Sequence, residues 1–194
     1  MATPLKRSDL MSLEQYSQQR GDFRSKVIAH KKHRRVGIGP HLFLYFEDRL
    51  TVQYQVQEML RIEKIFETAG IEDELGAYNP LIPDGQNLKA TAMLEYQDVD
   101  ERKQQLALLR GIEDMVWIQV DGFDRVYAIS NEDLERSNAE KTSAVHFMRF
   151  ELEPDMITAL RSGAALRMGS NHESYRHSTD VETRICSSLL ADLD

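Results

Sequence analysis

The chain has 194 residues, of which 41% are hydrophobic and 29% are charged, and its formal net charge is −8. This composition is typical of a globular protein with a substantial core, and it excludes disorder throughout the chain. Cys186 is the only cysteine, which excludes an intramolecular disulfide, a CxxC redox pair and a metal or iron–sulfur centre built on several thiolates of this chain.

The predicted location is the cytoplasm. No apolar run approaches the roughly 20 residues that a membrane-spanning helix needs. No apolar stretch follows Lys6 and Arg7 to make a secretory signal. The single cysteine is typical of a reducing compartment, so we expect a cytoplasmic protein with no membrane contact.

Charge is unevenly distributed. Residues 1–35 hold nine Lys or Arg against three Asp or Glu, which gives this segment a net charge of +6. Because the whole chain has a net charge of −8, residues 36–194 carry −14. An acidic body repels phosphate backbones, which disfavours nucleic acid as a partner. The basic segment can still contact a local anion or a protein partner, and the candidates for that contact are Lys31, Lys32, Arg34 and Arg35. The simpler explanation is that these cations complement the dipole at the end of a helix.

The first predicted elements are helices. Ser12 and Gln15 form a capping-box pattern that begins a helix, Gly21 interrupts it, and Asp22 caps a second helix. That second helix should end within residues 36–40, where two glycines and a proline do not continue a helix.

Strands and helices then alternate. Alternation over residues 41–47 predicts a strand, and apolar positions at helical spacing over 49–68 predict an amphipathic helix that ends at Gly70. Turn residues over 77–87 predict a loop, and residues 88–96 favour a strand.

The second half of the chain continues this pattern. Further strands are expected at 115–120, 125–129 and 142–152, and helices are expected to begin at Asp98, at Pro154 and after a Thr179–Glu182 capping box. Together the elements predict the α+β class, with one mostly antiparallel sheet, helices packed on it, and helices at both ends. We expect a single domain over 1–194, made of a basic helical segment (1–36), an α+β body (37–177) and a C-terminal helix (178–194).

Four ionisable residues are the candidates for a catalytic or metal site. His41 and Glu47 share one face of the strand over 41–47, and Glu58 lies on a stripe of the next helix with Arg61, its expected ion-pair partner. His146 falls on the apolar side of its strand, where it is either a tuned base or metal ligand, or a hydrogen-bonded core histidine.

A metal would have to be a single iron, zinc or manganese ion held by His and carboxylate groups. The chain has neither the HExxH nor the paired ExxH spacing of familiar helical metal sites. The shared site therefore requires His41, Glu47, Glu58 and His146 to converge in space.

Four segments resemble one bacterial family of small cytosolic proteins, the domain-of-unknown-function family numbered three thousand five hundred and one. The resemblance covers residues 8–177 and rests on VIAHKKHRRVGIGPHLFLYFEDRLTVQYQVQEMLRIEKI (27–65), YNPLIPDGQNLKATAMLEY (78–96), GIEDMVWIQVDGFDRVYAI (111–129) and KTSAVHFMRFEL (141–152). It implies no reaction and no catalytic residues. Members are commonly encoded beside a rubrerythrin-like di-iron protein and a heterodisulfide-reductase-like iron–sulfur protein, which suggests a redox or peroxide-defence module.

Three functions are consistent with these features. We favour a non-catalytic accessory protein that docks on a rubrerythrin-like or iron–sulfur partner, because the chain lacks the cysteines for a cluster and the paired motif for a di-iron centre. The alternative is a small metal-binding or acid–base enzyme acting on an anionic small molecule. A nucleic-acid or nucleotide-binding regulator using residues 31–35 is disfavoured by the acidic remainder. The sequence leaves the ligand, the partner and homo-oligomerisation open.

Overall fold

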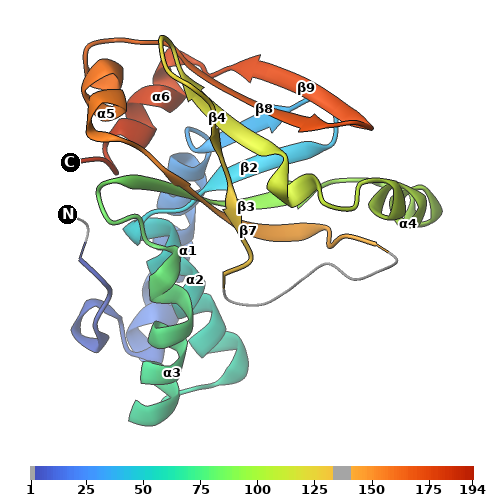
Figure 1. Cartoon of the computed structure of the whole chain (residues 1–194). Coiled ribbons are helices and arrows are strands. Elements are labelled where there is room, and N and C mark those ends of the chain that lie inside the picture. Colours follow the sequence, from blue (N-terminus) through green and yellow to red (C-terminus); the bar gives the residue numbers. More distant parts are fainter. Residues whose placement is uncertain (1–2, 133–140) are drawn as a thin grey trace.

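The computed structural model describes residues 3–132 and 141–194. Two antiparallel sheets form the body of the molecule, and three helices project together from one side of it (Figure 1). The predicted α+β class is confirmed, and the antiparallel strands are divided between two sheets where the sequence analysis expected one.

The five-stranded sheet carries the features relevant to function. Its strands, in spatial order, are β1 (Arg35–Ile38), β2 (Leu42–Phe46), β3 (Asn87–Leu94), β7 (Val145–Glu151) and β6 (Ile129–Ser130). Burial alternates strictly along β2, where Leu42, Leu44 and Phe46 are buried while Phe43 and Tyr45 are half-buried. One face of this sheet therefore packs on the main core, and the opposite, outer face is only partly covered.

The second sheet has four strands. In spatial order they are β5 (Val126–Tyr127), β4 (Val116–Val120), β8 (Leu166–His172) and β9 (Tyr175–Asp180). The Tyr175 hydroxyl joins the two sheets, because it donates to the Ile38 carbonyl (2.8 Å) and accepts from the amides of His41 (2.8 Å) and Leu42 (3.0 Å).

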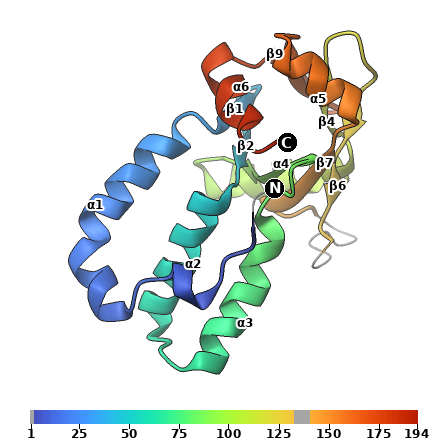
Figure 2. The ribbon, with the colours of Figure 1, turned by 90° about the vertical axis from the view of Figure 1, so that its left-hand side faces the viewer.

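The helices fall into two groups. α4 (Val99–Leu108), α5 (Pro154–Arg161) and α6 (Thr183–Leu190) contribute to the core between the sheets. α1 (Leu13–Lys31), α2 (Arg49–Glu63) and α3 (Thr68–Tyr78) form a separate helical lobe, which Figure 2 shows as three rods below the sheets. A smaller apolar cluster from α2, α3 and the N-terminal segment holds this lobe together. Short 3₁₀ turns lie at η1 (Arg7–Asp9), η2 (Asn79–Leu81) and η3 (Ile112–Asp114).

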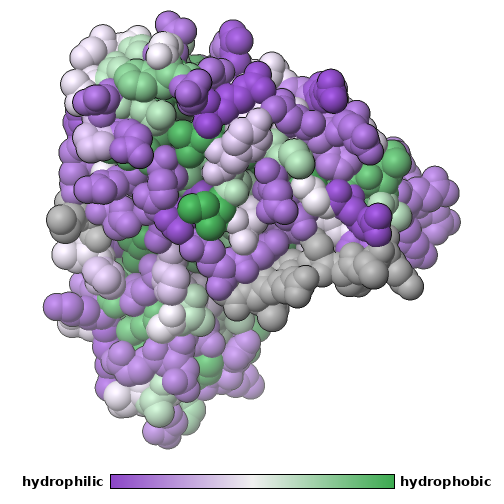
Figure 3. All heavy atoms as spheres, viewed as in Figure 1, coloured by the Kyte–Doolittle hydropathy of each residue, from purple (hydrophilic) through white to green (hydrophobic). Residues whose placement is uncertain are grey.

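Hydrophilic residues cover most of the face shown in Figure 3, and hydrophobic residues occur there only in small groups. Within the two described ranges, no helix combines the length and the apolar run needed to cross a membrane.

Several local predictions are confirmed. Ser12 and Gln15 form the expected capping box, Asp98 accepts from two amides at the start of α4, and Pro154 is the first residue of α5. The predicted strand pair over 115–129 forms as β4 and β5.

The predicted interruption at Gly21 is wrong. α1 runs through it without a break, because Tyr16 and Val27, which lie on either side, are both buried and anchor one continuous helix. A helical glycine costs only about 1 kcal/mol relative to alanine, which such packing offsets. The predicted helix end at 36–40 is also wrong: α1 stops at Lys31, and β1 pairs with β2 across a turn in which Gly39 has a φ of +66°.

The helix predicted over 49–68 is shorter than expected. α2 ends at Glu63 because Lys64 adopts a left-handed conformation, and Phe66 is 69% exposed. α3, β8 and β9 were not predicted. Thr179 lies within β9, so the capping box predicted there is wrong and Glu182 is the N-cap of α6.

Candidate functional site

The two candidates on β2 lie at opposite ends of the strand. His41 precedes the strand, stacks on Tyr96 with ring centroids 4.2 Å apart, and donates from Nδ1 to the Glu95 carbonyl (2.9 Å). Glu47 directly follows the strand. Glu47 lies six positions after His41 along extended chain, a distance of about 20 Å, so the two residues do not share a site.

Glu58 belongs to an ion-pair cluster between α1 and α2. Its carboxylate accepts two bonds from Arg20 (both 2.8 Å) and one from the Tyr16 hydroxyl (2.6 Å), and Arg61, the partner expected from sequence, lies 3.4 Å away. The hydrogen bond from Arg20 is the main cause that lowers the pKa of Glu58 to about 2. These contacts give Glu58 a structural role in joining two helices.

His146 is a core histidine. It is 1% exposed on the inner face of its sheet, whereas His41 and Glu47 continue the outward-facing positions of Phe43 and Tyr45 at either end of β2. Nε2 lies 3.0 Å from the Ser143 carbonyl, which can only accept, so Nε2 carries the proton and Nδ1 accepts from the Asn131 amide (3.1 Å). The sheet backbone separates His146 from the other candidates. In the part of the chain that the structure describes, no group of three or more His, Cys, Asp or Glu side chains could hold a metal.

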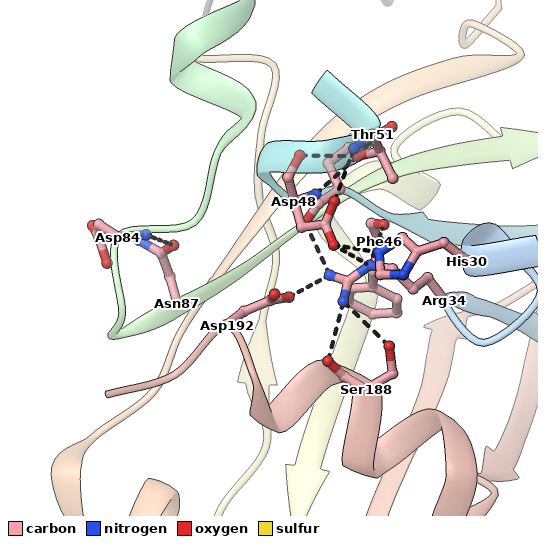
Figure 4. A network of polar contacts seen from close by, with 10 residues as sticks. His30, Arg34, Phe46, Asp48, Thr51, Asp84, Asn87, Ser188 and Asp192 are labelled. Atoms are coloured by element: carbon pink, nitrogen blue, oxygen red, sulfur yellow. Dashed lines mark hydrogen bonds and ion pairs between the residues drawn. The ribbon is translucent and has the colours of Figure 1, made fainter. Parts of the chain in front are cut away.

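One of the four basic candidates, Arg34, is bound inside the protein. Arg34 is 2% exposed and donates to the carbonyls of Phe46 (3.0 Å), Glu47 (3.1 Å) and Ser188 (3.1 Å). Figure 4 shows its guanidinium between the carboxylates of Asp48 and Asp192. Burial raises the pKa of the Asp192 carboxyl to about 6, and Arg34 opposes that rise.

The neighbouring cations are placed differently. Arg35 lies over the Phe43 ring at 3.9 Å and donates to the Tyr45 hydroxyl (3.0 Å). Lys32 is exposed, and Lys31, the last residue of α1, is half-buried at the edge of a pocket.

That pocket lies on the outer face of the five-stranded sheet and has a volume of about 490 Å³. Met93, Val145 and Phe147 from β3 and β7 contribute apolar side chains, and Tyr78 and Leu81 close one side. A mostly apolar hollow of this size with a few placed polar groups is typical of a small-molecule site.

Glu47 is the oriented acid of the pocket. Its two carboxylate oxygens accept from the hydroxyls of Thr51 (2.6 Å) and Thr91 (2.8 Å), one on α2 and one on β3. Among the described residues, no Lys, Arg or His nitrogen lies within 4.0 Å of this carboxylate. These two hydrogen bonds therefore orient the Glu47 carboxylate without neutralising its charge.

Lys31 supplies the opposite charge in the same pocket. It makes no ion pair with Glu47, and within the described ranges its ammonium has no hydrogen-bond partner. The pocket thus presents one anion and one cation over an apolar floor, and it combines Lys31 and Glu47, which the sequence analysis had placed in separate groups of candidates.

Two further hollows adjoin this pocket. One shares Met93 and Val145 with it and contains the His41–Tyr96 stack, and the other shares Tyr78, Leu81 and Phe147 with it and has a volume of about 530 Å³. The outer face of the sheet is therefore hollowed along β2, β3 and β7.

The profile of one protein family, described as protein of unknown function DUF3501, matches residues 4–193 of the chain. The chain belongs to this family. The resemblance inferred from the four sequence segments is therefore confirmed. The crystal structure of a protein of unknown function from Burkholderia pseudomallei is similar to this chain, with 51% sequence identity and a TM-score of 0.94, and the match covers 99% of this chain and 100% of that one. No curated protein matches the chain.

Sequence reasoning missed most of the pocket of this DUF3501 protein. Thr51 and Thr91 carried a usable signal, because both lie in segments that were predicted as a helix and a strand, and Thr91 alternates with buried alanines. Tyr78 could not be identified from the sequence, because α3 was not predicted and Tyr78, the last residue of that helix, was assigned to a loop.

Proposed function

We propose that this DUF3501 protein binds a small amphoteric molecule, which carries a cationic or N–H donor group, an acidic or acceptor group, and an apolar body. The observation that carries this proposal is the presence of Lys31 and Glu47 in one pocket without an ion pair between them. An amino acid with an apolar side chain is the simplest member of that class.

The chemistry of each contact supports the proposal. The Glu47 carboxylate is held by two hydroxyls and keeps lone pairs for a ligand ammonium, while the Lys31 ammonium can donate to a ligand carboxylate. The apolar part of the ligand would lie on Met93, Val145 and Phe147.

Calorimetric titration with leucine, methionine, phenylalanine and tryptophan tests this function. We expect Glu47→Gln and Lys31→Met each to weaken binding about 10- to 100-fold, since a hydrogen bond to a charged group contributes roughly 1.5–3 kcal/mol.

The matched controls are Glu63→Gln and Lys32→Met, which change exposed residues outside the pocket and should leave affinity unchanged. Failure of all four amino acids to bind would overturn the proposal, and so would binding that neither pocket variant weakens.

The uneven charge distribution favours a second role. A basic segment in a chain of net charge −8 suits electrostatic steering of an encounter with a protein partner. This supports the accessory role in a cytoplasmic redox module, with a rubrerythrin-like or iron–sulfur partner. We expect this protein to co-purify at low salt, and not at high salt, with a neighbouring rubrerythrin-like or iron–sulfur protein. The absence of a complex at every ionic strength would contradict the accessory role.

A further inference from the structure

The pocket of about 530 Å³ between α3, β6 and β7 differs in chemistry from the adjoining pocket that contains Lys31 and Glu47. Its walls are mainly apolar and include Met59, Ala77, Ile129 and Phe147. It also contains Lys89, which no step of the proposed function uses.

Lys89 is positioned by neutral groups. Its ammonium donates to the carbonyls of Pro80 (2.7 Å) and Ile82 (3.0 Å), and one of its three protons has no acceptor among the described residues. No carboxylate of those residues lies within 4.0 Å of it. Burial lowers the pKa of Lys89, which reflects the cost of holding this charge away from water.

The other cation of the pocket is already neutralised. Arg149 binds Glu132 through two parallel bonds (2.8 and 2.7 Å) and also pairs with Glu151. Lys89 is consequently the cation that remains for a ligand.

Glu47 does not neutralise Lys89 either, although the two are neighbours across β2 and β3. The Glu47 amide donates to the Lys89 carbonyl (2.8 Å), but the Glu47 side chain turns to Thr51 and Thr91 while the Lys89 side chain turns to the 80–82 segment. Because Glu47 and Lys89 each bind neutral groups and do not pair with each other, each pocket keeps its own charged group for a ligand.

We propose that this pocket is a second binding site, which takes a monocarboxylic acid with an apolar body, its carboxylate bound to Lys89. The apolar walls accommodate an alkyl chain or an aromatic ring, and the carboxylate supplies the acceptor that the third Lys89 proton lacks. Glu74 is the acidic group in the lining that has no cationic partner within 4.0 Å among the described residues, so it opposes binding of an anion.

Titration with octanoate, 1-octanol and 1-octylamine tests the site, because these probes share the alkyl chain and differ in the head group. We expect octanoate to bind, and octanol and octylamine to bind at least tenfold more weakly. Equal binding of the three would show selection for apolar bulk alone and would overturn the proposal.

Three variants make the test specific. Lys89→Met should weaken octanoate binding at least tenfold, and Glu74→Gln should strengthen it. Because Lys89 also holds the 80–82 segment, Ala77→Phe provides a variant that fills the pocket from an exposed position of α3 and leaves Lys89 in place. Octanoate affinity unchanged in both Lys89→Met and Ala77→Phe would overturn the proposal.

The two proposed sites can be tested independently, so that either proposal can be overturned without the other. Glu47→Gln should weaken the binding of amino acids and leave octanoate binding unchanged, whereas Ala77→Phe should do the reverse. Lys103→Met, a change at an exposed position of α4, is the control that should alter neither.

Discussion

Arg34 shows how a single side chain can depart from the pattern around it. It lies in a run of cations that suggested a surface for anions, yet it is buried and binds three carbonyls and two carboxylates from β2, the start of α2 and the end of the chain. Local sequence cannot reveal this, because Ser188 and Asp192 are more than 150 positions away.

We expect Arg34→Met to destabilise the protein by about 3–5 kcal/mol, since it leaves the largely buried carboxylates of Asp48 and Asp192 (16% and 8% exposed) without their guanidinium. Urea unfolding at pH 7 measures the effect. Arg35→Met is the matched control: the Arg35 side chain is 43% exposed, so we expect a loss of less than about 1 kcal/mol. Equal losses for the two variants would contradict the structural role assigned to Arg34.

At the scale of elements, two glycines have opposite roles that their sequence context does not distinguish. A Cβ atom on Gly169 in β8 would lie 2.3 Å from the Trp117 ring and 2.7 Å from a backbone oxygen of β9. A Cβ atom on Gly21 in α1 would meet nothing within 4 Å.

Gly169→Ala should therefore destabilise the protein by about 1–3 kcal/mol through overpacking. Gly21→Ala should stabilise it by about 0.5–1 kcal/mol, because alanine costs less backbone entropy in a helix. Thermal unfolding of both variants checks the signs, and a stabilised Gly169→Ala protein would show that the Trp117 ring can move aside.

Elements with a strong local signal could be predicted from the sequence. A few adjacent residues determine the N-cap of α1 at Ser12, the alternation along β2 and the start of α5 at Pro154. β8 could not, because its polar residues Ser170 and His172 are buried through contacts with distant parts of the chain. β9 could not either, because most of its residues are polar and exposed and show no apolar alternation. α2 ends where Lys64 adopts the left-handed conformation. This conformation is common for glycine and rare for lysine, so the sequence did not indicate a helix end at this position.

At the scale of the molecule, the two apolar clusters differ in size. The main core lies between the sheets and their helices, whereas the cluster of the helical lobe is much smaller. A smaller core stabilises its surroundings less, so the lobe should open before the sheets do.

Native-state hydrogen exchange tests this expectation. Amides of α3 should exchange at a lower free energy of opening than amides of β3, which pairs with strands on both sides. Equal protection of α3 and β3 would indicate one cooperative unit. Because α3 contributes Tyr78 to both proposed sites, addition of octanoate or an amino acid should raise the protection of α3 in particular.

The candidate site shows why sequence reasoning reached only part of the function. Lys31 and Glu47 were identified as candidates from their residue types and local patterns. Their meeting in one pocket depends on the packing of α1, α2 and the 78–81 segment over the outer sheet face, which no local spacing encodes. His146, which shares its strand pattern with apolar neighbours, was placed correctly on the buried side, and its hydrogen bonds explain it without a reaction.

The hydroxyl of Tyr175 has a consequence for folding kinetics. Its three bonds join residues separated by 133 to 137 positions along the chain, so they form only after both the β1–β2 turn and β9 are in place. Interactions of such long range, when they form late, slow unfolding more than they accelerate folding. We therefore expect Tyr175→Phe to raise the unfolding rate more than it lowers the folding rate, so that the two sheets stay joined for a shorter time.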